Sequence, residues 1–249
     1  MKNIKLIASI IGLIIFGAQA VPAQNIIQQR AQWFTYFGQY KFNTKWGIHT
    51  DIQFRTDEKA LRVNQNLVRV GIQYYPTKQT SITLGVAHTP SFNKTLGIYV
   101  PENRIWEQFI YNQNIKAATM THRVRLEQRF IHKYALNSSK EAERCGTNTG
   151  QRLRYFNRTL FNLTPKDKKN VLYLALQDEV FFNISAKNIN PNFFDQNRLL
   201  LAVGVWYDHH TRLELGYMNQ YIHPKSGDDI DNHIVHLSIL QVLNFAPTK

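Results

Sequence analysis

Cysteine, acidic residues and long apolar runs are all scarce in this chain of 249 residues. The single cysteine, Cys145, has no second cysteine with which to form an intrachain disulfide or a metal centre. No glycine-rich phosphate loop and no zinc-ligand spacing occurs in the sequence. Beyond residue 16, no apolar run approaches the ~20 residues that a transmembrane helix needs. These absences exclude a disulfide-stapled fold, the common nucleotide and zinc motifs, and a helical membrane protein.

The N-terminus has the three parts of a secretory signal peptide. A basic start is followed by an apolar run of 11 residues and then by small residues. The run is too short for a membrane-spanning anchor. The small residues predict cleavage after Ala23, with cleavage after Ala20 as the alternative. We therefore expect a signal peptide over residues 1–23 and one exported domain over residues 24–249.

Positive charge dominates the chain, with 30 lysines and arginines against 17 acidic residues and a formal net charge of +13. A basic exported protein is suited to bind nucleic acid, anionic lipid head groups or anionic solutes. The predicted placement of the arginines, described below, disfavours nucleic acid. Outer-membrane lipid and small anionic solutes are the partners that we expect.

Apolar and polar residues alternate with a period of two through the exported part of the chain. In one segment, Ile48, Ile52 and Phe54 alternate with His49 and Gln53, which is the pattern of a strand with two different faces. This alternation defines eleven strand-like segments, at residues 31–42, 45–56, 62–75, 79–89, 104–115, 119–133, 150–163, 170–183, 197–208, 212–223 and 232–245. Most are 11 to 15 residues long, a length suited to a tilted membrane crossing.

Short and long connections between these segments alternate strictly along the chain. Short turns on one side and longer loops on the other are typical of bacterial transmembrane barrels. Because lipid offers no partner to an open sheet edge, such strands must close on themselves. The sequence therefore predicts an all-β fold, a closed antiparallel transmembrane β-barrel in the outer membrane.

Bacterial barrels have even strand numbers, so we expect about twelve strands, with residues 24–30 adding one, and ten as the alternative.

The polar face of the strands is rich in arginine. An arginine facing lipid near the midplane costs about 2–4 kcal/mol, so this face must point into the lumen. The predicted lumen-lining residues are Arg69, Arg123, Arg125, Arg129, Arg152, Arg154 and Arg158, with Glu127, Glu179 and Glu214 as counter-charges. Aromatic residues near segment ends, among them Trp46 and Trp106, are predicted to lie at the membrane rims.

Two interpretations of this basic lumen stay open. Arginines and glutamates can close it in a hydrogen-bonded network that replaces an apolar core. Alternatively, the surplus arginines can line a narrow pathway for an anionic solute. A hairpin across residues 134–149 would bring Arg125 and Arg129 beside Arg158 and Arg154. The turn at residues 164–169 would bring Glu179 near Arg154.

Enzyme chemistry has weak support in the sequence. The best coincidence of nucleophile and base is Ser238 with His236, and Glu214 lies on the neighbouring segment. Alternation turns these residues inward, away from any lipid substrate. We therefore predict no catalytic residue, no metal site and no cofactor, and a structural barrel or narrow passive pore. An outer-membrane lipid-modifying enzyme and a soluble secreted β-protein that binds an anionic polymer are the alternatives.

Three stretches of the chain resemble a known family. They are residues 40–55, with Trp46 after the turn and Gln53 to Arg55 at the end, residues 67–74 and residues 82–87. They are similar to uncharacterised outer-membrane proteins of Gram-negative bacteria, grouped as domain of unknown function 2490. The resemblance implies an outer-membrane barrel and brings no known activity or functional residue.

Overall fold

The computed structural model describes residues 25–57, 62–115, 118–164 and 171–245. These residues form thirteen strands, and none of them belongs to a helix that could span a membrane. The predicted signal peptide lies outside the described residues. The strands are β1 (Ile26–Lys41), β2 (Trp46–Asp57), β3 (Val63–Tyr74), β4 (Thr80–His88), β5 (Ser91–Asn93), β6 (Ile98–Val100), β7 (Glu102–Ile115), β8 (Ala118–Leu136), β9 (Ala142–Asn162), β10 (Leu172–Ser185), β11 (Phe194–Trp206), β12 (Thr211–Ile222) and β13 (Asp229–Asn244).

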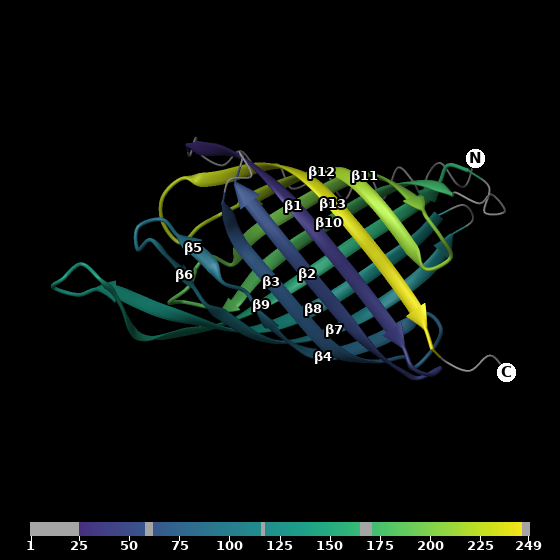
Figure 1. The fold of residues 1–249 in the computed structure, drawn as a ribbon, viewed down its shortest axis with the longest axis horizontal. Coiled ribbons are helices and arrows are strands. Elements are labelled where there is room, and N and C mark those ends of the chain that lie inside the picture. Colours follow the sequence, from purple (N-terminus) through teal and green to yellow (C-terminus); the bar gives the residue numbers. More distant parts are fainter. Residues whose placement is uncertain (1–24, 58–61, 116–117, 165–170, 246–249) are drawn as a thin grey trace.

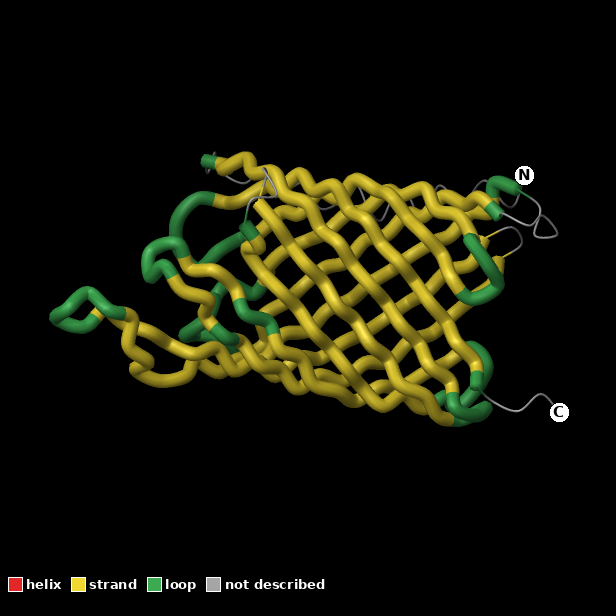
Figure 2. Tube along the Cα trace, in the orientation of Figure 1, coloured by secondary structure: helices red, strands yellow, loops and turns green. Residues whose placement is uncertain are grey.

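Eleven of these strands form a closed barrel, seen from the side in Figures 1 and 2. Neighbouring strands pair antiparallel around the ring from β1 through β2, β3, β4 and β7 to β13. The ring is completed by β1 and β13, which pair parallel over sixteen positions, from Ile26 with Asp229 to Lys41 with Asn244. Strands β5 and β6 form a small hairpin attached to β3 outside the ring. The predicted barrel is thus confirmed.

The number of strands in the ring is eleven, which differs from the expected twelve. Residues 26–30 do not form a separate strand; they are the first part of β1. The expectation of an even number assumed that every pair in the ring is antiparallel. Because β1 and β13 run in the same direction, the ring closes with an odd number.

The barrel is polar inside and apolar outside. Along β4, Ser81 and Thr83 are buried in the interior, whereas Ile82 and Leu84 face outward. Thr83 is 1% exposed and Leu84 is 58% exposed, which is the reverse of the pattern in a soluble protein. An apolar outer surface with a polar lumen is the arrangement that a barrel needs in lipid.

Short turns join the strands at one end of the barrel, which we call the short-turn end. Three of these turns begin with the same motif, in which a side-chain oxygen accepts hydrogen bonds from the backbone N–H groups two and three residues later. Asn43 accepts from Lys45 and Trp46 at 2.8 and 2.9 Å, and Thr77 accepts from two residues that follow it. Asp208 accepts from two backbone N–H groups at 2.7 and 2.6 Å, and these donors hold its pKa below the usual range.

At the opposite end, which we call the long-loop end, a long hairpin projects from the barrel. Residues 134–149, expected to be a loop, belong largely to strands, because β8 continues to Leu136 and β9 begins at Ala142. Together they form a hairpin that extends beyond the barrel, visible in Figures 1 and 2. The turn of this hairpin sets the register of the two strands that carry six of the lumenal arginines, at positions 123, 125, 129, 152, 154 and 158.

Candidate functional site

The interior of the barrel contains two cavities, one toward each end. The short-turn cavity has a volume of about 360 Å³ and reaches Lys41, Tyr75 and Lys78 at its outer rim. The long-loop cavity has a volume of about 500 Å³ and reaches Asn64 and Ser91. The two cavities share five wall residues, which are Trp33, Gln53, Arg69, Arg154 and Arg198. These shared residues mark the place where the two halves of the lumen meet.

Arginine is the main charged residue of both walls. Twelve arginines line one cavity or both, at positions 30, 55, 69, 104, 123, 125, 129, 152, 154, 158, 198 and 212. All seven arginines named from the sequence are among them. Arg123, Arg125 and Arg158 line the short-turn cavity, Arg129 and Arg152 line the long-loop cavity, and Arg69 and Arg154 line both. The period-2 alternation therefore places these side chains on the correct face.

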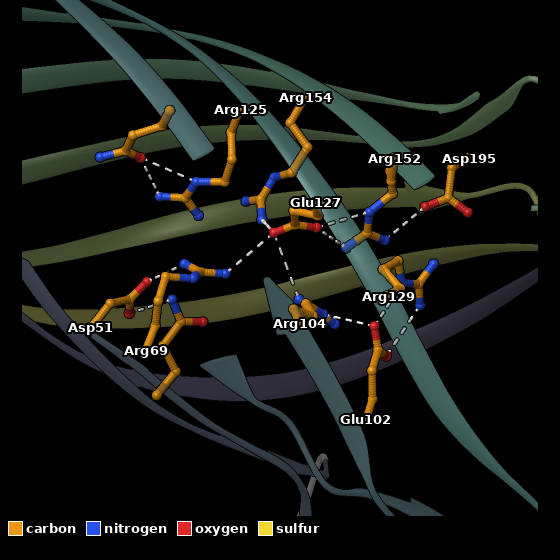
Figure 3. A network of polar contacts seen from close by, with 12 residues as sticks. Asp51, Arg69, Glu102, Arg104, Arg125, Glu127, Arg129, Arg152, Arg154 and Asp195 are labelled. Atoms are coloured by element: carbon orange, nitrogen blue, oxygen red, sulfur yellow. Dashed lines mark hydrogen bonds and ion pairs between the residues drawn. The ribbon is translucent and has the colours of Figure 1, made fainter. Parts of the chain in front are cut away.

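Glu127 is the centre of a network of ion pairs across the middle of the lumen (Figure 3). Its carboxylate is 0% exposed and accepts hydrogen bonds from Arg152 Nη2 at 2.7 Å and Arg154 Nη1 at 2.6 Å. Arg69 and Arg104 approach the same carboxylate at 3.5 and 3.8 Å. One buried anion on β8 thus interacts with four arginines of three other strands, β3, β7 and β9, which ties separate parts of the wall together.

The other predicted counter-charges also lie inside. Glu179 accepts from Arg123 at 2.6 Å and from Arg154 at 2.7 Å, so the expected contact between Glu179 and Arg154 is present. Glu214 accepts from Arg158 at 2.5 Å and from the hydroxyl of Tyr173 at 2.7 Å. Each glutamate accordingly holds at least one arginine in place.

Two further carboxylates of the network were missed by sequence reasoning. Glu102 accepts from Arg104 at 2.7 Å and from Arg129 at 2.6 Å, and Asp195 accepts from Arg152 at 2.9 Å. Glu102 is the first residue of β7 and Asp195 is the second residue of β11, and both lie in stretches that the sequence assigns to long loops. Neither stretch shows the alternation that would assign these residues to the inner face.

The register expected for the arginine hairpin is wrong. Arg125 lies directly opposite Arg154, not Arg158, and Arg129 lies opposite Gly150. The difference arises because the hairpin turns near Asn137 and continues as paired strands, whereas the sequence predicts a wide loop. The observed register places two arginines directly opposite each other on neighbouring strands, and their side chains bind different partners.

Four lumenal arginines form no ion pair with any carboxylate in the described residues. They are Arg55, Arg125, Arg198 and Arg212. Each instead lies over a tryptophan ring: Arg55 and Arg198 over Trp33 at 4.0 and 5.0 Å, Arg125 over Trp106 at 4.8 Å and Arg212 over Trp206 at 4.9 Å. The π-face of an indole attracts a cation but supplies no negative charge. The lumen therefore keeps a surplus of positive charge.

Trp106 belongs to this interior and not to the membrane rim, so its predicted place is wrong. It is 0% exposed, because it shares the inward face of β7 with Arg104 and Gln108. Space for its ring comes from Gly71 and Gly85, where a Cβ atom would lie 2.8 and 2.6 Å from the indole. A bulky rim residue could not be distinguished from a lumenal one by its position near a segment end.

The candidate nucleophile and base are in contact, and no acid of the described residues makes a hydrogen bond to the histidine. Ser238 Oγ lies 3.2 Å from His236 Nδ1, and both residues line the short-turn cavity. The other ring nitrogen, Nε2, lies 3.1 Å from the hydroxyl of Thr35, while Glu214 is engaged by Arg158 and Tyr173. No group of three histidine, cysteine or acidic side chains that could hold a metal occurs in the described part of the chain.

Residues 31–231 match the family model described as "Protein of unknown function (DUF2490)". The chain belongs to this family. The resemblance drawn from the sequence is thereby confirmed. A comparison with curated proteins gives no match.

A comparison with solved structures finds matches to two other proteins, among them a porin. The chain resembles the NanC porin, in a rhombohedral crystal form, with 10% identity, a TM-score of 0.45, and coverage of 78% of this chain and 84% of the porin. It also resembles the beta domain of the Bordetella autotransporter BrkA, with 10% identity, a TM-score of 0.40, and coverage of 74% and 78%. At such values the likeness concerns the fold alone.

Proposed function

We propose that this chain is an outer-membrane barrel that passes small anions through a narrow, arginine-lined lumen and has no catalytic role. The apolar outer surface supports a place in lipid, since the outward residues Leu84, Leu201 and Leu215 are each more than half exposed. The predicted export signal supports the outer membrane as that place. Lipid leaves a closed ring of strands as the stable β-structure.

The observation that carries the proposal is the surplus of guanidinium groups. A charge removed from water costs several kcal/mol unless it is paired. A lumen that served only as a packed plug would gain stability by matching each arginine with an acid, as Glu127 does for Arg152 and Arg154. Arg55, Arg125, Arg198 and Arg212 remain unmatched, as the basic groups of anion pores do.

The division of the lumen into two cavities supports a narrow pathway. A solute that enters at either end reaches the shared wall at Trp33, Arg154 and Arg198. Each of the two cavities is within the range of ~300–1,000 Å³ that small-molecule sites occupy. The solute must pass the arginines in the middle, which favours anions over cations.

Current measurements across a planar bilayer test the proposal. The exported chain, folded in detergent and inserted into the bilayer, is exposed to a gradient of KCl, and the potential at zero current is measured. We expect the sign that corresponds to a chloride preference. Absence of conductance, or a preference for potassium, would contradict the passage and leave a purely structural barrel.

A further inference from the structure

A tryptophan with two arginines lies where the two cavities meet. Trp33 of β1 is the direct cross-strand neighbour of Arg55 on β2, whose guanidinium lies 4.0 Å from the ring centre. Arg198 reaches the same ring from β11, at 5.0 Å. Trp33 and Arg198 line both cavities, and Arg55 lines the long-loop cavity. We call these three side chains the Trp33 stack.

Within the described ranges of the chain, no carboxylate forms an ion pair with either arginine of the Trp33 stack. Arg55 donates to the side-chain oxygens of Gln53 and Gln65, and Arg198 donates to Gln196 at 3.1 Å. Glutamine accepts a hydrogen bond but carries no charge. The acid directly opposite Arg198 in the sheet is Glu179, which is already taken by other arginines. Two positive charges are thus held together without an anion.

The ring covers the face of each guanidinium and not its hydrogen-bonding edge. In Arg55 this edge donates from Nε and Nη2 to Gln53 and from Nη1 to Gln65, so an anion bound there would replace a neutral amide oxygen. An indole contacts the face of the group, whereas a carboxylate or phosphate binds its edge through two parallel N–H bonds. An anion can therefore join Arg55 and Arg198 without displacing Trp33. The rigid indole also holds both groups in place before the anion arrives, which lowers the entropy cost of binding.

Amide side chains surround the Trp33 stack and indicate what else the anion carries. The long-loop cavity is lined by Gln29, Gln53, Asn64, Gln65, Gln196 and Gln220. Among the described residues, Gln29 and Asn64 make no side-chain hydrogen bond. Amides donate and accept, as hydroxyl groups do. Gln29, which is exposed, and Asn64, which is half-buried, can therefore bind further polar groups of the anion that an inorganic ion would not offer.

We infer that the Trp33 stack is a binding site for an organic carboxylate that bears several hydroxyl groups. Arg55 and Arg198 hold the carboxylate, and the amides of the long-loop cavity hold the hydroxyls. The inference deepens the proposed function, because it names the class of anion that the lumen selects. The cavity volume of about 500 Å³ accommodates a molecule of this kind.

Calorimetric titration of gluconate into the folded barrel in detergent micelles tests the inference. Gluconate should bind, while glucitol, which lacks the carboxylate, and hexanoate, which lacks the hydroxyls, should bind at least roughly tenfold more weakly. Arg55→Gln and Arg198→Gln should each weaken gluconate binding by about tenfold or more. Circular dichroism and heat-modified gel mobility establish that each variant is folded.

A matched control is Arg62→Gln. Arg62 lies near the same end of the barrel and over an aromatic ring, Phe92, at 4.6 Å, but it lines neither cavity. Its replacement removes the same charge and should leave gluconate binding unchanged. Equal affinities for gluconate and hexanoate, or equal losses in the Arg62 and Arg198 variants, would overturn the inference.

The same preparation separates this inference from the proposed function. Anion-selective current without gluconate binding would overturn the site and leave the passage. Gluconate binding that is lost in the Arg198 variant, in a barrel without current, would support the site and contradict the passage. Gluconate binding together with reduced chloride current in the presence of gluconate would support both.

Discussion

At the scale of single residues, the buried charges of the lumen are of two kinds: some have an oppositely charged partner in the wall and others do not. Glu127 is fully buried and accepts hydrogen bonds from Arg152 and Arg154, so its negative charge is compensated within the wall. Arg125 is equally buried, yet it donates only to the amide oxygen of Gln108, at 2.6 and 3.1 Å. Ion-paired side chains stabilise the barrel by linking its strands. Arginines without an acidic partner can instead bind an anion.

Replacement of Glu127 should therefore be costly. Glu127→Gln removes the negative charge that Arg152 and Arg154 share, and leaves Arg152 with Asp195 and Arg154 with Glu179 as their carboxylate partners. We expect a loss of about 3–5 kcal/mol in the free energy of unfolding, the cost typical of breaking a buried ion pair. Urea unfolding of the folded barrel in micelles measures it. Glu143→Gln, on the exposed hairpin, is the control; equal stabilities of the two variants would contradict the bracing role.

At the scale of strands and hairpins, the extension of β8 and β9 provides a site at which the orientation of the barrel in the membrane can be tested. The exposed Cys145 lies in this extension and is the single cysteine of the chain. We expect a membrane-impermeant maleimide to label it in intact cells, because longer loops face outward in bacterial barrels.

A matched probe of the other end is the double variant Cys145→Ala with Lys78→Cys, which moves the thiol to a short turn. Labelling of this variant should require disruption of the outer membrane. If the short-turn thiol reacts in intact cells and Cys145 does not, the orientation is reversed.

Most of the strands could be predicted from the sequence, because lipid outside and polar groups inside give each strand two different faces. The extension beyond residue 133 could not. Its residues, such as Glu143 and Thr147, are exposed to water on both sides of the hairpin, so nothing enforces a period of two. The register of the arginines depends on the turn of this hairpin, and it was missed for the same reason.

The candidate site was predictable in part. Alternation alone is enough to place the lumenal arginines, because an arginine side chain on the lipid-facing side of a strand costs free energy. It does not identify partners such as Glu102 and Asp195, which lie where strands begin. It also does not distinguish Trp106 from a rim aromatic, because only the glycines opposite, Gly71 and Gly85, make room for the ring inside.

At the scale of the whole molecule, the parallel pairing of β1 and β13 closes the ring. Phe34 and Leu237 are partners in this seam, and both side chains face outward. In a Cys145→Ala background, Phe34→Cys with Leu237→Cys should form a disulfide on mild oxidation, detected as a shift in the mobility of the denatured chain. The pair Phe34→Cys with Ile239→Cys, two residues out of register, is the control. An open or twelve-stranded ring would give no preference for the first pair.

The central claim is that uncompensated guanidinium groups inside the barrel set its preference for anions. The most direct test is the zero-current potential of a fourfold variant, Arg55→Gln, Arg125→Gln, Arg198→Gln and Arg212→Gln, in a planar bilayer under a KCl gradient. We predict that the chloride preference of the unmodified barrel is abolished or reversed in this variant. A potential unchanged from that of the unmodified barrel would contradict the claim.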